Sequence, residues 1–116
     1  MVREVLRREG WALIDRRRQS AGFDYQASRG DKTIFVEVKS SAGPCAPSLT
    51  AKEFREASRL ADKYIVAIVE NFEPTRDARI LWVRNPARLS LTSRTVEVYP
   101  LARAVWLPYA TVDIEG

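Results

Sequence analysis

The sequence of 116 residues contains no histidine and a single cysteine. Without histidine, a Ser-His-Asp triad, a Cys-His pair and a histidine general base are all excluded. One cysteine also cannot supply the usual structural zinc sites, which need four nitrogen or sulfur ligands. An enzyme of this composition must therefore work with carboxylates, lysine, hydroxyl groups or a cation bound through oxygen.

Long apolar runs are missing as well. The N-terminal residues 1–4 lack the apolar core of a signal peptide, and the longest apolar run, residues 64–69, is too short to span a membrane. The lone Cys45 has no second cysteine to pair with, which is typical of proteins from a reducing compartment. We therefore expect a cytoplasmic protein that does not enter a membrane.

The chain carries more basic than acidic residues. Nineteen lysines and arginines against fifteen acidic residues give a net charge of +4 and an isoelectric point near 9.6. Arginine, which is well suited to forked contacts with phosphate, makes up most of the basic residues. This balance favours a polyanionic partner, and the length is typical of one domain.

The pattern of apolar residues predicts a mixed α/β domain. A capping box begins at Thr50, and Trp11, Trp82 and Trp106 lie in apolar segments, so we expect them in the core rather than stacked on bases. The predicted elements are a helix at 2–9 ended by Gly10, strands at 11–14, 23–27 and 33–39, a loop at 40–49, a helix from Thr50 to about Asp62, a strand at 64–69 covered on both faces, a turn at 71–77, and strands at 79–83, 95–99 and 104–107.

A predicted hairpin brings two carboxylates together. Side chains alternate between the faces of a strand, so Glu37 and Lys39 share a face. If Gly30 and Asp31 form a two-residue turn, Asp24 lies directly across from Glu37. Directly opposed residues have Cβ atoms about 5 Å apart, and two carboxylates held so close require a cation between them or a raised pKa.

Oxygen ligands with room for water suit Mg²⁺, which commonly takes one or two carboxylates. Lys39, beside Glu37, could orient or deprotonate a water molecule or stabilise the charge on a phosphate. Together these groups are the parts needed for metal-assisted phosphodiester hydrolysis. The alternative interpretation of the Val-Glu-Val-Lys sequence is an ordinary solvated strand face.

The same residues resemble a known nuclease signature. Asp24, the step of 13 residues to Glu37, and the sequence Glu37-Val38-Lys39 are similar to the PD-(D/E)xK motif. Within that superfamily, the sequence most resembles the NO VEIN C-terminal domain family, which often occurs as one module of larger proteins. The residues that carry this second resemblance are 22–24, 36–40, 49–50, Glu53 and Ala57.

The resemblance implies a fold and a metal site. The implied fold is a single domain over residues 1–116 with its motifs in residues 4–86: a restriction-endonuclease-like mixed sheet flanked by helices, followed by extra C-terminal strands. The implied site holds Mg²⁺ or Mn²⁺ on Asp24, Glu37 and the Val38 carbonyl, with Asp24, Glu37 and Lys39 catalytic.

One departure from the family pattern leaves two functions open. Such nucleases often carry a further glutamate on the first helix, at a position that would fall at or before Met1 here. Glu4 and Glu9 are the nearest helix carboxylates. The first function is a metal-dependent nuclease acting on DNA. The second is a catalytically inactive nuclease-like module that binds nucleic acid or a partner protein.

Two basic clusters are candidates for nucleic-acid contact. One follows the first predicted strand, and the other recurs at helical spacing on the second predicted helix. A solvated loop and the solvent face of a helix are the alternative interpretations. The clusters consist of Arg16, Arg17 and Arg18, and of Lys52, Arg55 and Arg59.

Overall fold

The computed structural model describes residues 1–42, 46–70, 79–89 and 98–114, and it confirms the predicted mixed α/β class. Within these residues, no helix is long and apolar enough to cross a membrane. The elements in chain order are α1 (Val2–Arg8), β1 (Ala12–Asp15), β2 (Tyr25–Arg29), β3 (Lys32–Ser41), β4 (Ser48–Thr50), α2 (Ala51–Leu60), η1 (Ala61–Lys63), β5 (Tyr64–Glu70), β6 (Arg79–Arg84), η2 (Pro86–Leu89), β7 (Val98–Pro100), α3 (Arg103–Trp106) and η3 (Leu107–Tyr109).

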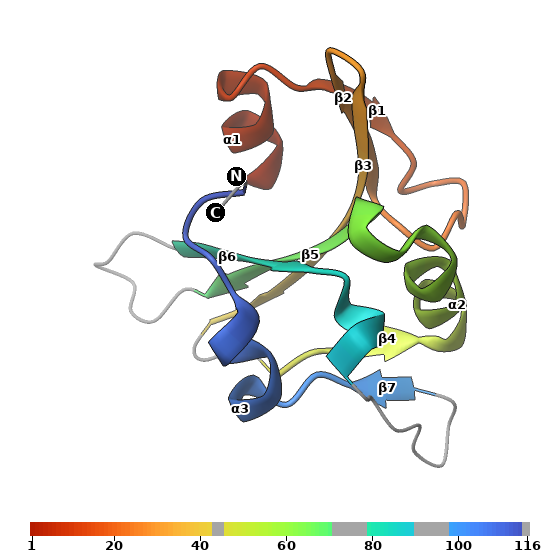
Figure 1. The fold of residues 1–116 in the computed structure, drawn as a ribbon, viewed down its shortest axis with the longest axis vertical. Helices are drawn as coiled ribbons and strands as arrows, with labels where there is room; N and C mark the ends of the chain where they lie inside the picture. The colour runs from red at the N-terminus through yellow and green to blue at the C-terminus, as the bar shows by residue number, and fades with distance from the viewer. Residues whose placement is uncertain (43–45, 71–78, 90–97, 115–116) are drawn as a thin grey trace.

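The main sheet has five strands in the order β1-β2-β3-β5-β6. β3 and β5 run parallel, and every other neighbouring pair in this sheet is antiparallel. Figure 1 shows α1 and α2 on opposite faces of this sheet, with the shorter β4–β7 sheet below α2. The predicted mixed sheet flanked by helices is therefore confirmed.

Two apolar cores lie on the two faces of the sheet. The core under α1 includes Val2, Leu6, Trp11, Tyr25, Val36, Ile65 and Ala67. The core under α2 includes Leu49, Ala57, Tyr64, Val66, Ile68, Leu101 and Trp106. β5 contributes alternate side chains to both cores, which confirms the prediction of a strand covered on both faces. The three tryptophans are buried, as expected.

The hairpin has the predicted register. A two-residue turn begins at Gly30, whose φ of +62° lies in the left-handed region that favours glycine. Tyr25 pairs with Val36, so the residue before the strand, Asp24, falls in line with Glu37. The site residues therefore meet where β2 begins and β3 continues past it.

The C-terminal prediction of a strand at 104–107 is wrong, because residues 103–106 form α3. A short apolar run cannot be told from a buried helical turn by periodicity alone, and Trp106 fills the core from α3. Of the extra strands, the described residues contain β7, which pairs with β4 inside the predicted loop. Cys45, the predicted turn at 71–77 and residues 95–97 lie outside the described residues.

Candidate active site

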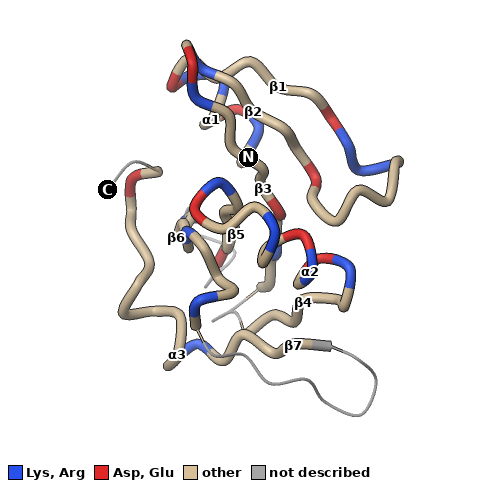
Figure 2. Tube along the Cα trace, turned by 45° about the vertical axis from the view of Figure 1, so that its right-hand side comes forward, with Lys and Arg blue, Asp and Glu red and all other residues tan. Residues whose placement is uncertain are grey.

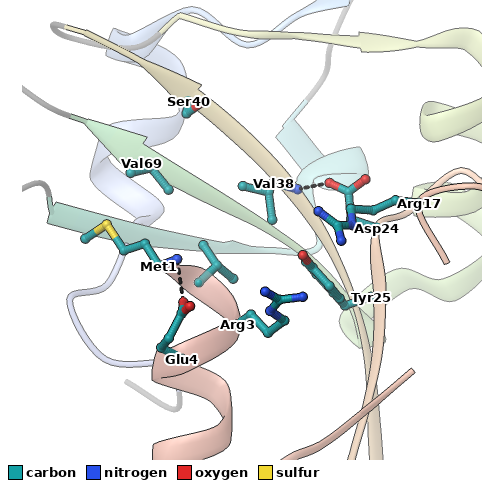
Figure 3. A pocket seen from close by; sticks show the side chains of 10 residues that line it. Met1, Arg3, Glu4, Arg17, Asp24, Tyr25, Val38, Ser40 and Val69 are labelled. Carbon is teal, nitrogen blue, oxygen red and sulfur yellow. Dashed lines mark hydrogen bonds and ion pairs between the residues drawn. The ribbon is translucent and has the colours of Figure 1, made fainter. Parts of the chain in front are cut away.

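Asp24 lies at the open end of the β2–β3 hairpin. Its backbone N–H donates to the Val36 carbonyl at 2.9 Å, which continues the ladder by one bond. Its Oδ2 then accepts a hydrogen bond from the Val38 N–H at 2.8 Å, the contact drawn as a dashed line in Figure 3. Burial raises the pKa of Asp24, and the Val38 N–H partly offsets this rise. Two backbone groups thus fix where this carboxylate points.

The Val38 carbonyl faces the same space. The N–H and C=O of one strand residue point toward the same neighbouring strand. The Val38 N–H donates to Asp24, on the β2 side of β3. The Val38 carbonyl therefore also points to that side, beyond the last residue pair of β2 and β3. The Asp24 carboxylate and the Val38 carbonyl therefore present oxygen atoms at one edge of the sheet.

Glu37 and Lys39 lie on the face of β3 that is covered by α2. Glu37 is 6% exposed, and its Oε2 lies 3.5 Å from the Lys39 Nζ. Burial raises the pKa of Glu37, and the neighbouring charges of Glu53 and Asp24 raise it further. A buried carboxylate in the field of two others favours a neighbouring cation, and carboxylate oxygens are donors of the kind that Mg²⁺ takes.

Glu53 is a functional candidate that the sequence analysis did not place in the site. Its Oε1 accepts from the Lys39 Nζ at 2.9 Å and from the Thr50 N–H at 2.9 Å. Burial raises the pKa of Glu53, but the bonds from Thr50 and Lys39 outweigh burial and lower it. The capping box was visible in the sequence, and it fixes this carboxylate at the start of α2.

A cavity of about 520 Å³ opens between α1 and the start of β2. Figure 3 shows Arg3 and Glu4 of α1 on one side, and Asp24, Tyr25 and Val38 on the other. The cavity thus reaches Asp24 from the face of the sheet opposite Lys39. Asp24 and Val38 are therefore reached from the α1 face, while Glu37 and Lys39 lie on the face that α2 covers.

The two helix carboxylates have different places. Glu4 lines the cavity, and its carboxylate pairs with the Met1 α-amino group at 2.5 Å. Glu9 is the C-cap of α1 at the other end of the helix, where its carbonyl accepts from Arg29 at 2.8 Å. The structure brings Glu4 toward Asp24 and leaves Glu9 near the hairpin turn.

A profile of the family described as Protein NO VEIN, C-terminal, matches residues 1–82. The chain belongs to this family. The match includes Asp24, Glu37, Lys39 and Glu53, and it confirms the resemblance seen in the sequence. A search of curated proteins found no match to the chain.

The chain is similar in structure to Hjc of Archaeoglobus fulgidus, a Holliday junction resolvase from an archaeal hyperthermophile. The TM-score is 0.64 at 20% sequence identity, over 99% of this chain and 97% of that chain. At this identity the likeness shows the fold alone. The chain therefore has the fold of that resolvase, a mixed sheet flanked by helices.

The two basic clusters lie in different elements, and Arg17 of the first lines the same cavity as Asp24. Figure 2 shows basic residues on the segment after β1 and along α2. Arg17 is paired with Asp15 at 2.6 Å, and Arg59 with Glu56 at 2.7 Å. Arg16 bonds to Gln19 at 2.8 Å and to Gln26 at 3.3 Å. The other members, Arg18, Lys52 and Arg55, are exposed.

Gly22 lies in the segment after β1 and packs directly on α2, so it connects the two parts of the chain that carry the basic clusters. Its φ is +87°, and an added Cβ would lie 2.7 Å from the Glu56 Cγ and 3.2 Å from the Lys52 carbonyl oxygen. The Tyr64 hydroxyl donates to the Gly22 carbonyl at 2.7 Å and holds this approach in place. The segment after β1 is thereby held beside the basic face of α2.

We expect Gly22→Ala to lower the free energy of unfolding of the protein by about 2 kcal/mol or more. The left-handed backbone alone costs roughly 1–2 kcal/mol for alanine, and the clash with α2 adds to it. Gly30→Ala is the matched control, because its φ is +62° but no atom lies within 4 Å of the added Cβ. Urea denaturation of both variants checks this, and an equal loss in the two would contradict the close packing.

Proposed function

We propose that this protein is a metal-dependent nuclease that hydrolyses DNA phosphodiester bonds at a site formed by Asp24, Glu37 and Lys39. One observation carries the proposal: two carboxylates, a strand carbonyl and a lysine ammonium converge where the β2 ladder ends. The nuclease-like fold supports it, because the site residues occupy a hairpin in the central sheet of that fold.

The proposed metal ligands are the carboxylates of Asp24 and Glu37 and the carbonyl of Val38, for either Mg²⁺ or Mn²⁺. These are oxygen donors, which both ions prefer. When bound, the metal would lower the pKa of a water molecule and polarise a phosphoryl oxygen. Asp24 is oriented for this by the Val38 N–H, so its carboxylate needs little reorganisation.

Lys39 is the residue we assign to the reacting phosphate. Its side chain is 19% exposed, so the ammonium is partly shielded from solvent but accessible. There it would position the attacking water or stabilise the negative charge that develops on the phosphate in the transition state. The pKa of Lys39 stays above its ordinary value, because burial lowers it while the bond to Glu53 and the charge of Glu37 raise it more.

The choice of DNA rests on charge and on the structural neighbour. The clusters on the segment after β1 and on α2 would contact phosphates on either side of the site. The similar protein is named a Holliday junction resolvase, and a Holliday junction is made of DNA. Both observations favour a DNA backbone as the substrate.

A cleavage assay tests the proposal. Purified protein is incubated with supercoiled plasmid, a labelled duplex and a four-way DNA junction, in Mg²⁺, in Mn²⁺ and in EDTA. We expect cleavage in at least one metal and none in EDTA, because the proposed site supplies no other source of activated water. DNA binding that persists in EDTA, with no cleavage in either metal, would instead indicate the inactive binding module.

A further inference from the structure

We propose that Glu53 is a positioning residue that holds the Lys39 ammonium at the reacting phosphate, an inference that rests on the proposed nuclease function. Lys39 lies between two carboxylates, with its Nζ 2.9 Å from the Glu53 Oε1 and 3.5 Å from the Glu37 Oε2. The bond to Glu53 is the shorter one. The side chains of Lys39 and Glu53 are 19% and 15% exposed, so water competes weakly for this pair.

Glu53 is itself fixed by the start of α2. Its Oε1 accepts from the Thr50 N–H at 2.9 Å, while its own N–H donates to the Thr50 Oγ1 at 3.1 Å. Both bonds of the capping box are therefore made, and one oxygen of Glu53 serves the helix and Lys39 together. The lysine side chain has a flexible four-carbon stem, so a fixed acceptor removes much of its freedom.

The short second sheet holds this capping box in place. β4 ends at Thr50, the N-cap of α2, and pairs with β7 in antiparallel register. Phe54, next to Glu53, stacks on Tyr99 of β7 with ring centroids 3.9 Å apart and planes 7° from parallel. The C-terminal part of the chain thus supports the first turn of α2 and, through Glu53, the position of Lys39.

The two carboxylates beside Lys39, Glu37 and Glu53, have different proposed roles. Glu37 is a proposed metal ligand, so its carboxylate oxygens would be occupied by the metal. Glu53 comes from the start of α2, makes the shorter contact with the ammonium, and remains its partner when Glu37 is engaged. This division explains why a residue of the capping box belongs to the site without itself touching the phosphate.

Glu53→Gln separates the two roles of this side chain. Glutamine also serves at this position of a capping box, so the bond from Thr50 is kept while the charge that holds Lys39 is removed. We expect kcat for DNA cleavage to fall about 10- to 100-fold with little change in KM, because a misplaced catalytic group costs rate at that scale. Glu53→Asp, which restores the charge on a shorter side chain, should recover part of the loss.

Ala57→Gly is the control for a purely structural effect. It weakens α2 by about 1 kcal/mol, because glycine is a poor helix former, but it leaves the Thr50 cap, the Glu53 side chain and the bond to Lys39. We expect this variant to be less stable to urea yet to keep the wild-type kcat. Equal loss of kcat in Ala57→Gly and Glu53→Gln would overturn the positioning role, because helix loosening would then explain both.

A second measurement does not depend on cleavage. The rate at which an amine-reactive reagent labels Lys39 is followed by mass spectrometry, with Lys52 and Lys63 as exposed internal references. We expect Glu53→Gln to speed labelling of Lys39 and to leave both references unchanged. An unchanged Lys39 rate would contradict the proposed restraint.

The outcomes distinguish this inference from the function on which it rests. If the wild-type protein fails to cleave DNA in Mg²⁺ and Mn²⁺, the nuclease proposal fails and the inference fails with it. If the wild-type protein cleaves and Glu53→Gln cleaves at the same kcat, only the role of Glu53 is overturned.

Discussion

Asp24→Asn should lower the rate of metal-dependent DNA cleavage by about 1,000-fold while the protein stays folded. A bound metal supplies several kcal/mol of transition-state stabilisation, and each 1.4 kcal/mol is a factor of ten in rate. The amide keeps an oxygen that can accept from the Val38 N–H, so the hairpin geometry is retained. The change therefore removes the ligand charge without removing the contact that orients it.

The measurement is a single-turnover cleavage rate at saturating Mg²⁺ or Mn²⁺, paired with a DNA-binding titration. Asp31→Asn is the matched control, because it makes the same chemical change in the turn at the other end of the hairpin. We expect Asp31→Asn to cleave like the wild type. Wild-type cleavage by Asp24→Asn would remove Asp24 from the metal site.

Glu70→Ala should be the most destabilising carboxylate substitution among those considered, with a loss of about 3 kcal/mol in the free energy of unfolding. Glu70 is fully buried at the end of β5. It accepts from Arg103 at 2.9 Å and 3.2 Å, and from Arg79 at 3.2 Å. Its removal leaves a cavity and breaks the ion pair that joins Arg103 of α3 to the sheet. The expected loss of unfolding free energy is at the low end of the range for breaking a buried ion pair, because the guanidinium groups left behind can reach water.

Glu56→Ala provides the comparison for Glu70→Ala. Glu56 also binds an arginine in two places, Arg59 at 2.7 Å and 3.0 Å, but this pair lies on the outer face of α2. Surface pairs contribute about 1 kcal/mol or less, so this variant should unfold close to the wild-type urea midpoint. A similar loss of unfolding free energy in the two variants would show that burial of Glu70 does not strengthen the contribution of its ion pairs to stability.

Local rules made the hairpin predictable from the sequence. Gly30 is favoured in a left-handed turn position, and strand alternation then fixes which residues share a face. These two facts placed Asp24 across from Glu37, and the observed pairing of Tyr25 with Val36 has the same register. Both elements are close in sequence, so no knowledge of the remaining fold was needed.

Contacts that depend on packing between distant elements could not be predicted. Glu53 reaches Lys39 because α2 lies over one face of β3, and no local pattern specifies that placement. Trp106 was assigned to a strand because its segment is apolar, yet α3 buries it against the face of the sheet covered by α2. In both cases tertiary packing, not local preference, decides the outcome.

The central claim is that Asp24, Glu37 and the Val38 carbonyl hold a divalent metal beside Lys39. Titration of Mn²⁺ into the wild-type protein and into Asp24→Asn, followed by electron paramagnetic resonance of the free ion, tests this claim most directly. We expect saturable binding by the wild type and binding at least about tenfold weaker in the variant, since even changes around a metal's ligands cost 10- to 100-fold in affinity. Absence of saturable binding by the wild type, or equal affinity in the two proteins, would contradict the claim.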